Sequence, residues 1–187
     1  MAIRPITITG EPVLHTPASP VTAFDQDLVD LVHDMFETMD KAPGVGLAAP
    51  QVGVGLRVFV YDYENDAGHF RNVAINPELE LGPVSTEWPD EETELEGCLS
   101  IPGERFPLKR ADHAVLRAQD IEGNKYEVIA TGWLARIFQH EFDHLNGTLY
   151  ADRLLKPYAR EMKSIIKAEG WGKPGNSWTP GVDYQEP

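Results

Sequence analysis

Residues 132–147 read GWLARIFQHEFDHLNG, and this stretch decides the fold that the sequence predicts. Its apolar side chains recur at the spacing of one helix face, because about 3.6 residues complete a helical turn. These side chains are Leu134, Ile137, Phe138 and Leu145. The pair Asn146-Gly147 is typical of a helix end, since glycine readily adopts the left-handed backbone that stops a helix. We therefore expect a helix over about 132–145.

Two histidines on this predicted helix point in the same direction. His140 and His144 are four residues apart, so their imidazoles lie one turn apart on one face and can reach a single metal ion. Glu141 follows the first histidine, where its carboxylate can accept a proton from a metal-bound water. The alternative is a pair of surface histidines on an acidic helix. The apolar residues around them favour the metal site.

A catalytic site of this type needs a third protein ligand and one open position. No histidine follows His144, and nothing distinctive surrounds the downstream acids Asp152, Glu161 and Glu169. The only cysteine, Cys98, lies upstream, and a thiolate is a strong ligand for iron(II) or zinc. Taken alone, a single cysteine is better explained as a small buried apolar residue. Beside two histidines that lack a third ligand, its interpretation as a ligand is favoured.

The remaining pattern predicts a mixed fold. Helices are expected at about 25–40 and 157–170, and strands at about 57–61, 72–76, 114–118 and 125–130. Because helices and strands do not alternate regularly, we expect an α+β fold rather than a doubly wound sheet. The acidic segment 82–96 is predicted to be mostly a solvated loop. A length of 187 residues fits one domain, 1–187, in which 171–187 is an irregular C-terminal tail.

Composition narrows the classes of protein. With 16 basic and 30 acidic residues the net charge is −14, which repels phosphate backbones and disfavours general nucleic-acid binding, although a local basic patch remains possible. No apolar run approaches the roughly 18 residues of a membrane span. The first ten residues lack the apolar core of a secretory signal, and one cysteine cannot form an internal disulfide. We therefore expect a cytoplasmic protein that does not bind membranes.

Three motifs, in this order, resemble those of the peptide deformylases, bacterial enzymes that remove the formyl group from the N-terminal formyl-methionine of new proteins. The motifs are GVGLAAPQ at 44–51, EGCLS at 96–100 and QHEFDH at 139–144. The resemblance covers about the first 155 residues. It implies an α+β fold in which antiparallel sheets wrap around the central helix that carries the HExxH motif, and the periodicity adds a C-terminal helix.

The resemblance implies a metal-dependent hydrolase that releases formate from N-formyl-methionyl nascent peptides. By motif, Cys98, His140 and His144 resemble the metal ligands of the family, and Glu141 resembles its general acid and base. The usual metal of the family is iron(II), and zinc, nickel or cobalt can also occupy the site. We therefore expect one divalent metal ion as the cofactor.

Other motif residues resemble the groups that hold the substrate. Gln51, through its side-chain amide, and Leu99, through its backbone N–H, resemble the donors to the oxyanion. Val45, Gly46 and Gly97 are expected to offer backbone groups to the peptide.

The pocket for the methionine side chain is predicted from position on the helix. Arg136 and Ile137 lie one turn before His140, so they are candidates to line it, and the alternative is that both simply pack or face solvent. Ile137 suits an apolar wall, whereas the head of Arg136 must reach water or an acid. We also expect Arg110 to pair with Asp143 and brace the helix.

The last predicted helix carries a basic face, formed by Lys156, Arg160, Lys163 and Lys167. Two interpretations stay open for it. It is an ordinary solvated face, or it docks on ribosomal RNA near the exit tunnel, as the C-terminal helix does in the family.

Two other functions compete with the deformylase hypothesis. A peptidase of the HExxH type would cut ordinary peptide bonds and would not need Cys98. A protein whose metal only stabilises the fold would need a fourth protein ligand, for which the sequence offers no clear candidate.

Overall fold

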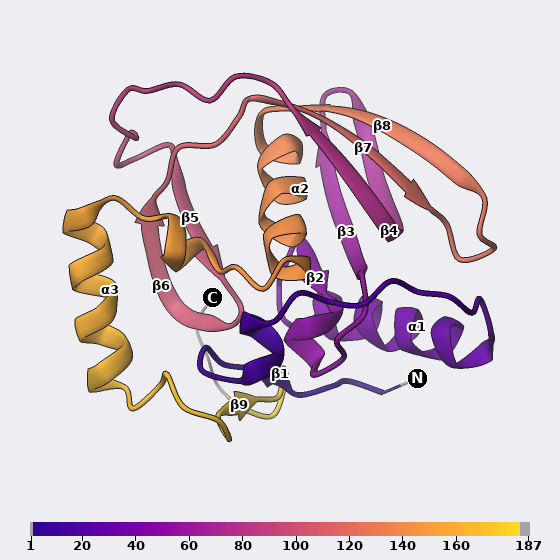
Figure 1. The fold of residues 1–187 in the computed structure, drawn as a ribbon, viewed down its shortest axis with the longest axis horizontal. Coiled ribbons are helices and arrows are strands. Elements are labelled where there is room, and N and C mark those ends of the chain that lie inside the picture. The colour runs from indigo at the N-terminus through magenta and orange to yellow at the C-terminus, as the bar shows by residue number, and fades with distance from the viewer. Residues whose placement is uncertain (1, 184–187) are drawn as a thin grey trace.

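The computed structural model describes residues 2–183 as helices packed against antiparallel sheets (Figure 1). In chain order the elements are β1 (Ile6–Thr7), η1 (Pro12–His15), α1 (Gln26–Lys41), β2 (Gly46–Ala48), η2 (Ala49–Val52), β3 (Val58–Asn65), β4 (Gly68–Leu81), β5 (Leu95–Cys98), β6 (Ile101–Pro107), β7 (His113–Gln119), β8 (Lys125–Thr131), α2 (Gly132–Leu145), η3 (Tyr150–Arg153), α3 (Lys156–Ala168) and β9 (Ser177–Trp178). No helix among the described residues is both long and apolar enough to pass through a bilayer.

The strands form antiparallel sheets on two sides of α2. The larger sheet has the order β2-β3-β4-β7-β8, and β5 pairs with β6 in a separate hairpin. Figure 1 shows α2 standing between this hairpin and the larger sheet. The arrangement confirms the predicted α+β fold, with antiparallel sheets around the histidine-bearing helix.

The central position of α2 explains its composition. The helix spans Gly132–Leu145, as predicted, and it is buried on most of its circumference because strands cover it from two sides. On the side of the larger sheet, the ring of Phe138 meets that of Tyr61 edge-on, with centroids 4.9 Å apart. The helix stops where predicted, and Gly147 has a φ of +71° that side chains rarely tolerate.

The first helix, α1, packs on β2 and β3. Its predicted start is confirmed, since the Asp25 side chain caps the helix by accepting a hydrogen bond from the Leu28 N–H at 3.1 Å. Leu28, Met35 and Met39 bury its apolar face in a core that also includes residues of β1 and β9.

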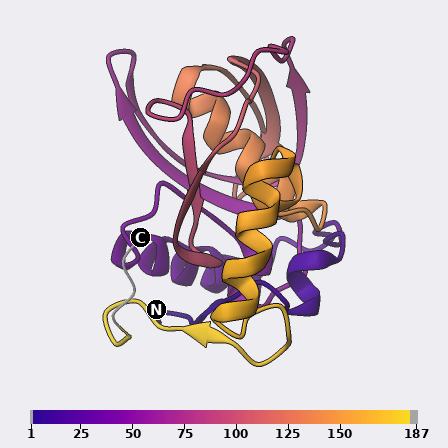
Figure 2. The ribbon, with the colours of Figure 1, turned by 90° about the vertical axis from the view of Figure 1, so that its left-hand side faces the viewer.

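The C-terminal helix, α3, lies on the side of the β5–β6 hairpin that faces away from α2 (Figures 1 and 2). Met162 is buried, and Tyr158 and Ile165 are half-buried beside it, against a cluster that includes residues of β6. The predicted basic residues Lys156, Arg160, Lys163 and Lys167 are all exposed.

The structure departs from the sequence predictions in the acidic segment and in the tail. Glu87, Asp90 and Glu91 are exposed as expected, but Glu96 belongs to β5 and is buried. The tail is predicted to be irregular, but Ser177–Trp178 forms β9 and pairs with β1. The physical reason is that the apolar side chain of Trp178 is buried in the core. Residues 184–187 of that tail lie outside the described part of the chain.

Candidate metal centre

The three predicted metal ligands lie close together where the end of β5 approaches α2. Within residues 2–183, Cys98, His140 and His144 form the group whose potential ligand atoms all lie within 4.8 Å of one another. The His144 Nε2 atom is 3.3 Å from Cys98 Sγ and 3.2 Å from His140 Nε2. Helix α2 brings the two imidazoles together by its periodicity, and β5 ends at the cysteine.

These separations fit a metal ion. Around a tetrahedral ion with bonds of about 2.1 Å to nitrogen and 2.3 Å to sulfur, two nitrogens lie about 3.4 Å apart and a nitrogen and a sulfur about 3.6 Å apart. The distances of 3.2 and 3.3 Å are close to these values. One thiolate and two imidazoles suit iron(II) or zinc, and three protein ligands leave a position for water or substrate.

Glu141 lies beside these three residues, and one of its carboxylate oxygens accepts no hydrogen bond from the described residues. Its side chain is 4% exposed, and its Oε2 atom has no hydrogen-bond partner among the described residues. Burial raises the pKa of the carboxyl to about 7. A buried carboxylate with a free oxygen next to a metal site has the position of a general base.

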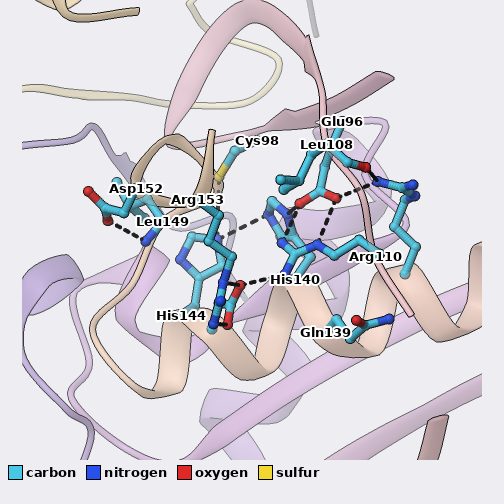
Figure 3. Close-up of polar contacts among 12 residues, drawn as sticks. Glu96, Cys98, Leu108, Arg110, Gln139, His140, His144, Leu149, Asp152 and Arg153 are labelled. Atoms are coloured by element: carbon cyan, nitrogen blue, oxygen red, sulfur yellow. Dashed lines mark hydrogen bonds and ion pairs between the residues drawn. The ribbon is translucent and has the colours of Figure 1, made fainter. Parts of the chain in front are cut away.

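Glu96 orients the first histidine (Figure 3). Its Oε1 atom lies 2.7 Å from His140 Nδ1, which leaves Nε2 of that ring facing Cys98 and His144. Arg110 donates to both oxygens of Glu96, at 2.6 and 3.1 Å, and Arg136 Nη1 donates to Oε2 at 2.9 Å. Burial opposes the charge, but hydrogen bonds from His140 and Arg110 hold the pKa of Glu96 well below its usual range. A carboxylate held in this way fixes the tautomer and direction of a metal-binding histidine.

The predicted pair of Arg110 and Asp143 is confirmed. Arg110 Nη1 donates to Asp143 Oδ2 at 2.7 Å, so one guanidinium links Glu96 on β5 to Asp143 on α2. Arg153 of η3 donates to both oxygens of Asp143. The helix that carries both histidines is thereby fastened to the elements before and after it.

The two predicted oxyanion donors both lie at this site. The side chain of Gln51 is buried, and its Nε2 atom donates to Ser100 Oγ at 3.3 Å and lies 3.7 Å from Cys98 Sγ. Its Oε1 atom accepts from the Ala48 N–H at 2.8 Å, which fixes the amide so that the NH₂ group points to the site. Leu99 directly follows the cysteine and contributes to the same cavity wall.

A cavity of about 310 Å³ opens onto these groups. The predicted substrate residues Val45, Gly46, Gly97, Arg136 and Ile137 all line it. Ile137 is buried and gives the apolar wall that was expected. Arg136 presents its stem, because its guanidinium donates to Glu96 and to the Leu108 carbonyl oxygen at 2.8 Å and stacks over the Trp133 ring.

Sequence reasoning gave no role to Glu96 and missed Trp178, which also lines the cavity. A signal for Glu96 existed, since residues two apart on a strand point to the same side and Glu96 precedes Cys98 by two. Trp178 has no such signal, because its position depends on the pairing of two distant short strands.

A cysteine sulfur and two imidazoles that can share one ion, with a buried carboxyl group beside them at a cavity, define on this α+β frame a metal-dependent hydrolase with a single-ion site. Comparisons with known proteins narrow this class. The profile of the polypeptide deformylase family matches residues 3–160. The chain belongs to the polypeptide deformylase family.

Individual relatives are similar to this chain over most of its length. A peptide deformylase from Mycolicibacterium paratuberculosis is 50% identical over 189 residues, covering 97% of this chain and 96% of that protein. The crystal structure of a peptide deformylase from Legionella pneumophila superposes with a TM-score of 0.77 at 38% identity, covering 90% of this chain and 96% of that one. One from Synechococcus elongatus, in complex with actinonin, gives a TM-score of 0.73 at 36% identity, covering 89% and 85%.

Proposed function

We propose that this chain binds one divalent metal ion through Cys98, His140 and His144 and uses it to hydrolyse the formyl amide of N-formyl-methionyl peptides. The reaction releases formate and a peptide with a free N-terminus. The observation that carries the proposal is the convergence of the three ligand atoms beside the unpartnered Oε2 atom of Glu141, in a chain of the deformylase family.

The bound ion supplies a Lewis acid that polarises the formyl carbonyl and lowers the pKa of a water molecule. Glu141 Oε2 accepts the proton of the attacking water, because it is the free oxygen of a carboxylate that lies beside the ligands. The same carboxyl then delivers this proton to the nitrogen of the leaving peptide. Both ligand histidines are buried, so bulk water is excluded from the parts of the site that do not face the cavity.

Two donors of the chain stabilise the charge that develops on the carbonyl oxygen. The NH₂ group of Gln51 is aimed at the site by the Ala48 N–H, and the backbone N–H of Leu99 follows the ligand cysteine. Removing one such donor in other enzymes costs about 3–4 kcal/mol of transition-state stabilisation. Preorganised donors of this kind act mainly on kcat.

The substrate lies in the 310 Å³ cavity. Ile137 and the stem of Arg136 form the wall that receives the methionine side chain. The peptide lies extended in the cavity and forms hydrogen bonds with backbone groups of Val45, Gly46 and Gly97, as one β-strand does with another. An apolar wall next to polar backbone groups is the usual composition of a small-ligand site.

The ion in the cell is proposed to be iron(II), with zinc, nickel or cobalt able to replace it. The ligand set, one thiolate and two imidazoles, supports a metal of intermediate softness. A thiolate ligand also makes the site sensitive to oxygen, because Cys98 can be oxidised once iron is lost.

The chain is proposed to act in the cytoplasm as a single catalytic domain over 1–187, where nascent peptides emerge. The exposed basic face of α3 supports docking on ribosomal RNA, against the overall negative charge of the molecule. Reversing two charges, with Arg160→Glu and Lys163→Glu, is expected to abolish co-sedimentation with ribosomes while formate release from a short peptide is unchanged. Unchanged co-sedimentation would leave the face as an ordinary solvated one.

The test of the reaction is formate release from a formyl-methionyl tripeptide by protein prepared without oxygen and loaded with iron(II). Glu141→Gln is expected to lower kcat by a factor of about 100 or more while retaining the metal. Glu161→Gln, on the exposed side of α3, is the matched control and should behave as the parent. If the parent holds one metal ion and releases no formate, the proposal fails and ordinary peptide bonds become the substrates to test.

A further inference from the structure

The two residues after the candidate ligand cysteine form a tight turn. Strand β5 ends at Cys98 and β6 begins at Ile101, and these two residues pair with each other. Leu99 and Ser100 therefore lie outside the ladder of the hairpin. Their orientation depends on contacts with other parts of the chain.

One of these contacts comes from the C-terminal segment. The indole Nε1 atom of Trp178 donates a hydrogen bond to the Leu99 carbonyl oxygen at 2.8 Å. That carbonyl belongs to the peptide group whose N–H, on Ser100, points to Cys98 Sγ with a nitrogen–sulfur distance of 3.4 Å. A single planar peptide group thus joins the indole to the candidate ligand sulfur.

Trp178 is itself buried and belongs to a paired strand. It is 5% exposed in the core that includes Met39, and it pairs with Ile6 in the short sheet of β1 and β9. The Ile8 N–H also donates to the carbonyl of Asn176 at 3.0 Å, which extends the pairing. The family profile ends at residue 160, so this support comes from a segment outside the matched region.

We propose that Trp178 is a positioning residue of the metal centre, which holds the Leu99–Ser100 peptide group and through it the directions of Cys98 Sγ and the Leu99 N–H. This inference rests on the roles proposed above for Cys98 and Leu99. An N–H group directed at a thiolate withdraws charge from the sulfur and limits its rotation, and such supporting contacts to metal ligands typically change affinity about 10–100-fold when removed. The indole fixes the opposite end of the same peptide group.

The first test compares Trp178→Phe with Trp88→Phe. Trp88 is exposed and donates its indole N–H to the Tyr158 hydroxyl at 3.2 Å, so the control also removes an indole hydrogen bond. Three quantities are measured: the zinc affinity of the metal-free protein, the thiolate-to-cobalt charge-transfer absorption of the cobalt(II)-loaded protein, and kcat for formate release. Trp178→Phe should weaken zinc binding about tenfold, shift the charge-transfer band and lower kcat. Trp88→Phe should change none of these.

A second variant separates the hydrogen bond from the packing. Replacing Trp178 with benzothienylalanine, in which sulfur takes the place of the indole N–H, keeps the size of the ring, so the protein folds even if Trp178→Phe does not. We expect it to reproduce the loss of zinc affinity and the shifted band while Tm of the metal-free protein stays near that of the parent. Parent-like zinc affinity and absorption in this variant would overturn the inference.

The zinc and cobalt readouts do not depend on the reaction. If the unmodified chain releases no formate, the proposed function fails, but the zinc and cobalt measurements still decide whether Trp178 positions Cys98. Parent-like metal binding with a lowered Tm would assign Trp178 a role in folding only.

Discussion

Gly46 on β2 lies directly against the carboxylate of Glu141 on α2. A Cβ atom at Gly46 would overlap Oε1 of Glu141 and come within 2.9 Å of its Cγ. Its motif leads us to expect that Gly46 offers backbone groups to the peptide, and the structure adds that this glycine makes room for the candidate general base. The absence of a side chain at one position therefore sets where the carboxylate lies.

Gly46→Ala is expected to lower kcat by a factor of about 10 or more, because a methyl group there must displace Glu141, which is proposed to accept the proton. Zinc affinity should change little, since no ligand moves. Steady-state formate release and a zinc titration measure the two effects. Gly55→Ala is the control, because a Cβ atom there has its nearest neighbour at 3.9 Å. An unchanged kcat would show that the carboxylate is not needed in its present position.

Glu96→Gln is expected to weaken both the fold and the metal centre. The change leaves Arg110 and Arg136 without their shared buried anion, and breaking such a pair costs about 3–5 kcal/mol of the free energy of unfolding. It also weakens the acceptor that orients His140, so zinc affinity should fall about 10–100-fold. Urea unfolding and a competition titration test this. Glu87→Gln, an exposed acid of the preceding loop, should leave both quantities as in the parent.

Removal of the metal should expose the thiol to chemical modification. Cys98 is the only cysteine, so the extent of reaction with a thiol reagent reports on this one group. In the loaded protein the sulfur should be protected, and a chelator should increase its reaction rate at least tenfold because a metal-bound thiolate is not available as a nucleophile. Equal rates with and without zinc would contradict the assignment of Cys98 as a ligand.

The acidic loop before β5 should loosen at low pH. Glu94 accepts hydrogen bonds from Lys109 Nζ at 2.7 Å and from the Asp90 N–H at 2.8 Å. Burial opposes the charge, but the hydrogen bond from Lys109 contributes to keeping the pKa of Glu94 below its ordinary value. Its contribution to stability is therefore present above the unfolded-state pKa and is lost as the pH falls through the lower folded-state pKa.

Amide hydrogen exchange, corrected for intrinsic rates, should show this as reduced protection of 90–94 relative to α1 between neutral pH and about pH 3. Glu94→Gln should already be loosened at neutral pH and show a smaller further change. If protection of this segment does not depend on pH in the parent, the Glu94 carboxylate does not hold the loop.

Local signals predicted most of the helices and long strands. The spacing of Leu134, Ile137 and Phe138, with Asn146-Gly147 as the stop, predicted α2, and the start of α1 was expected at about Asp25. The strands expected at about 114–118 and 125–130 are present as β7 and β8, and in the turn between them the Asp120 carboxylate accepts from the N–H groups of Glu122 and Asn124. Each of these signals lies within a few residues of the element that it predicts.

What the sequence did not predict depends on distant contacts. Strand β5 is only four residues long, and its buried Glu96 was grouped with exposed acids because its partners Arg110, Arg136 and His140 are far away in sequence. Arg136 lines the cavity, and the direction of its guanidinium depends on that same glutamate. The counter-charges that stabilise the buried Glu96 are brought together only by the fold.

The pairing of β1 with β9 has a consequence for synthesis. Ile6 is synthesised long before its partner Trp178. Contacts between such distant segments form late, because a long loop must close before they can form. The turn that follows Cys98 thus acquires the contact from Trp178 late, and a chain that has not yet placed this residue should hold a metal ion more weakly than the complete fold does.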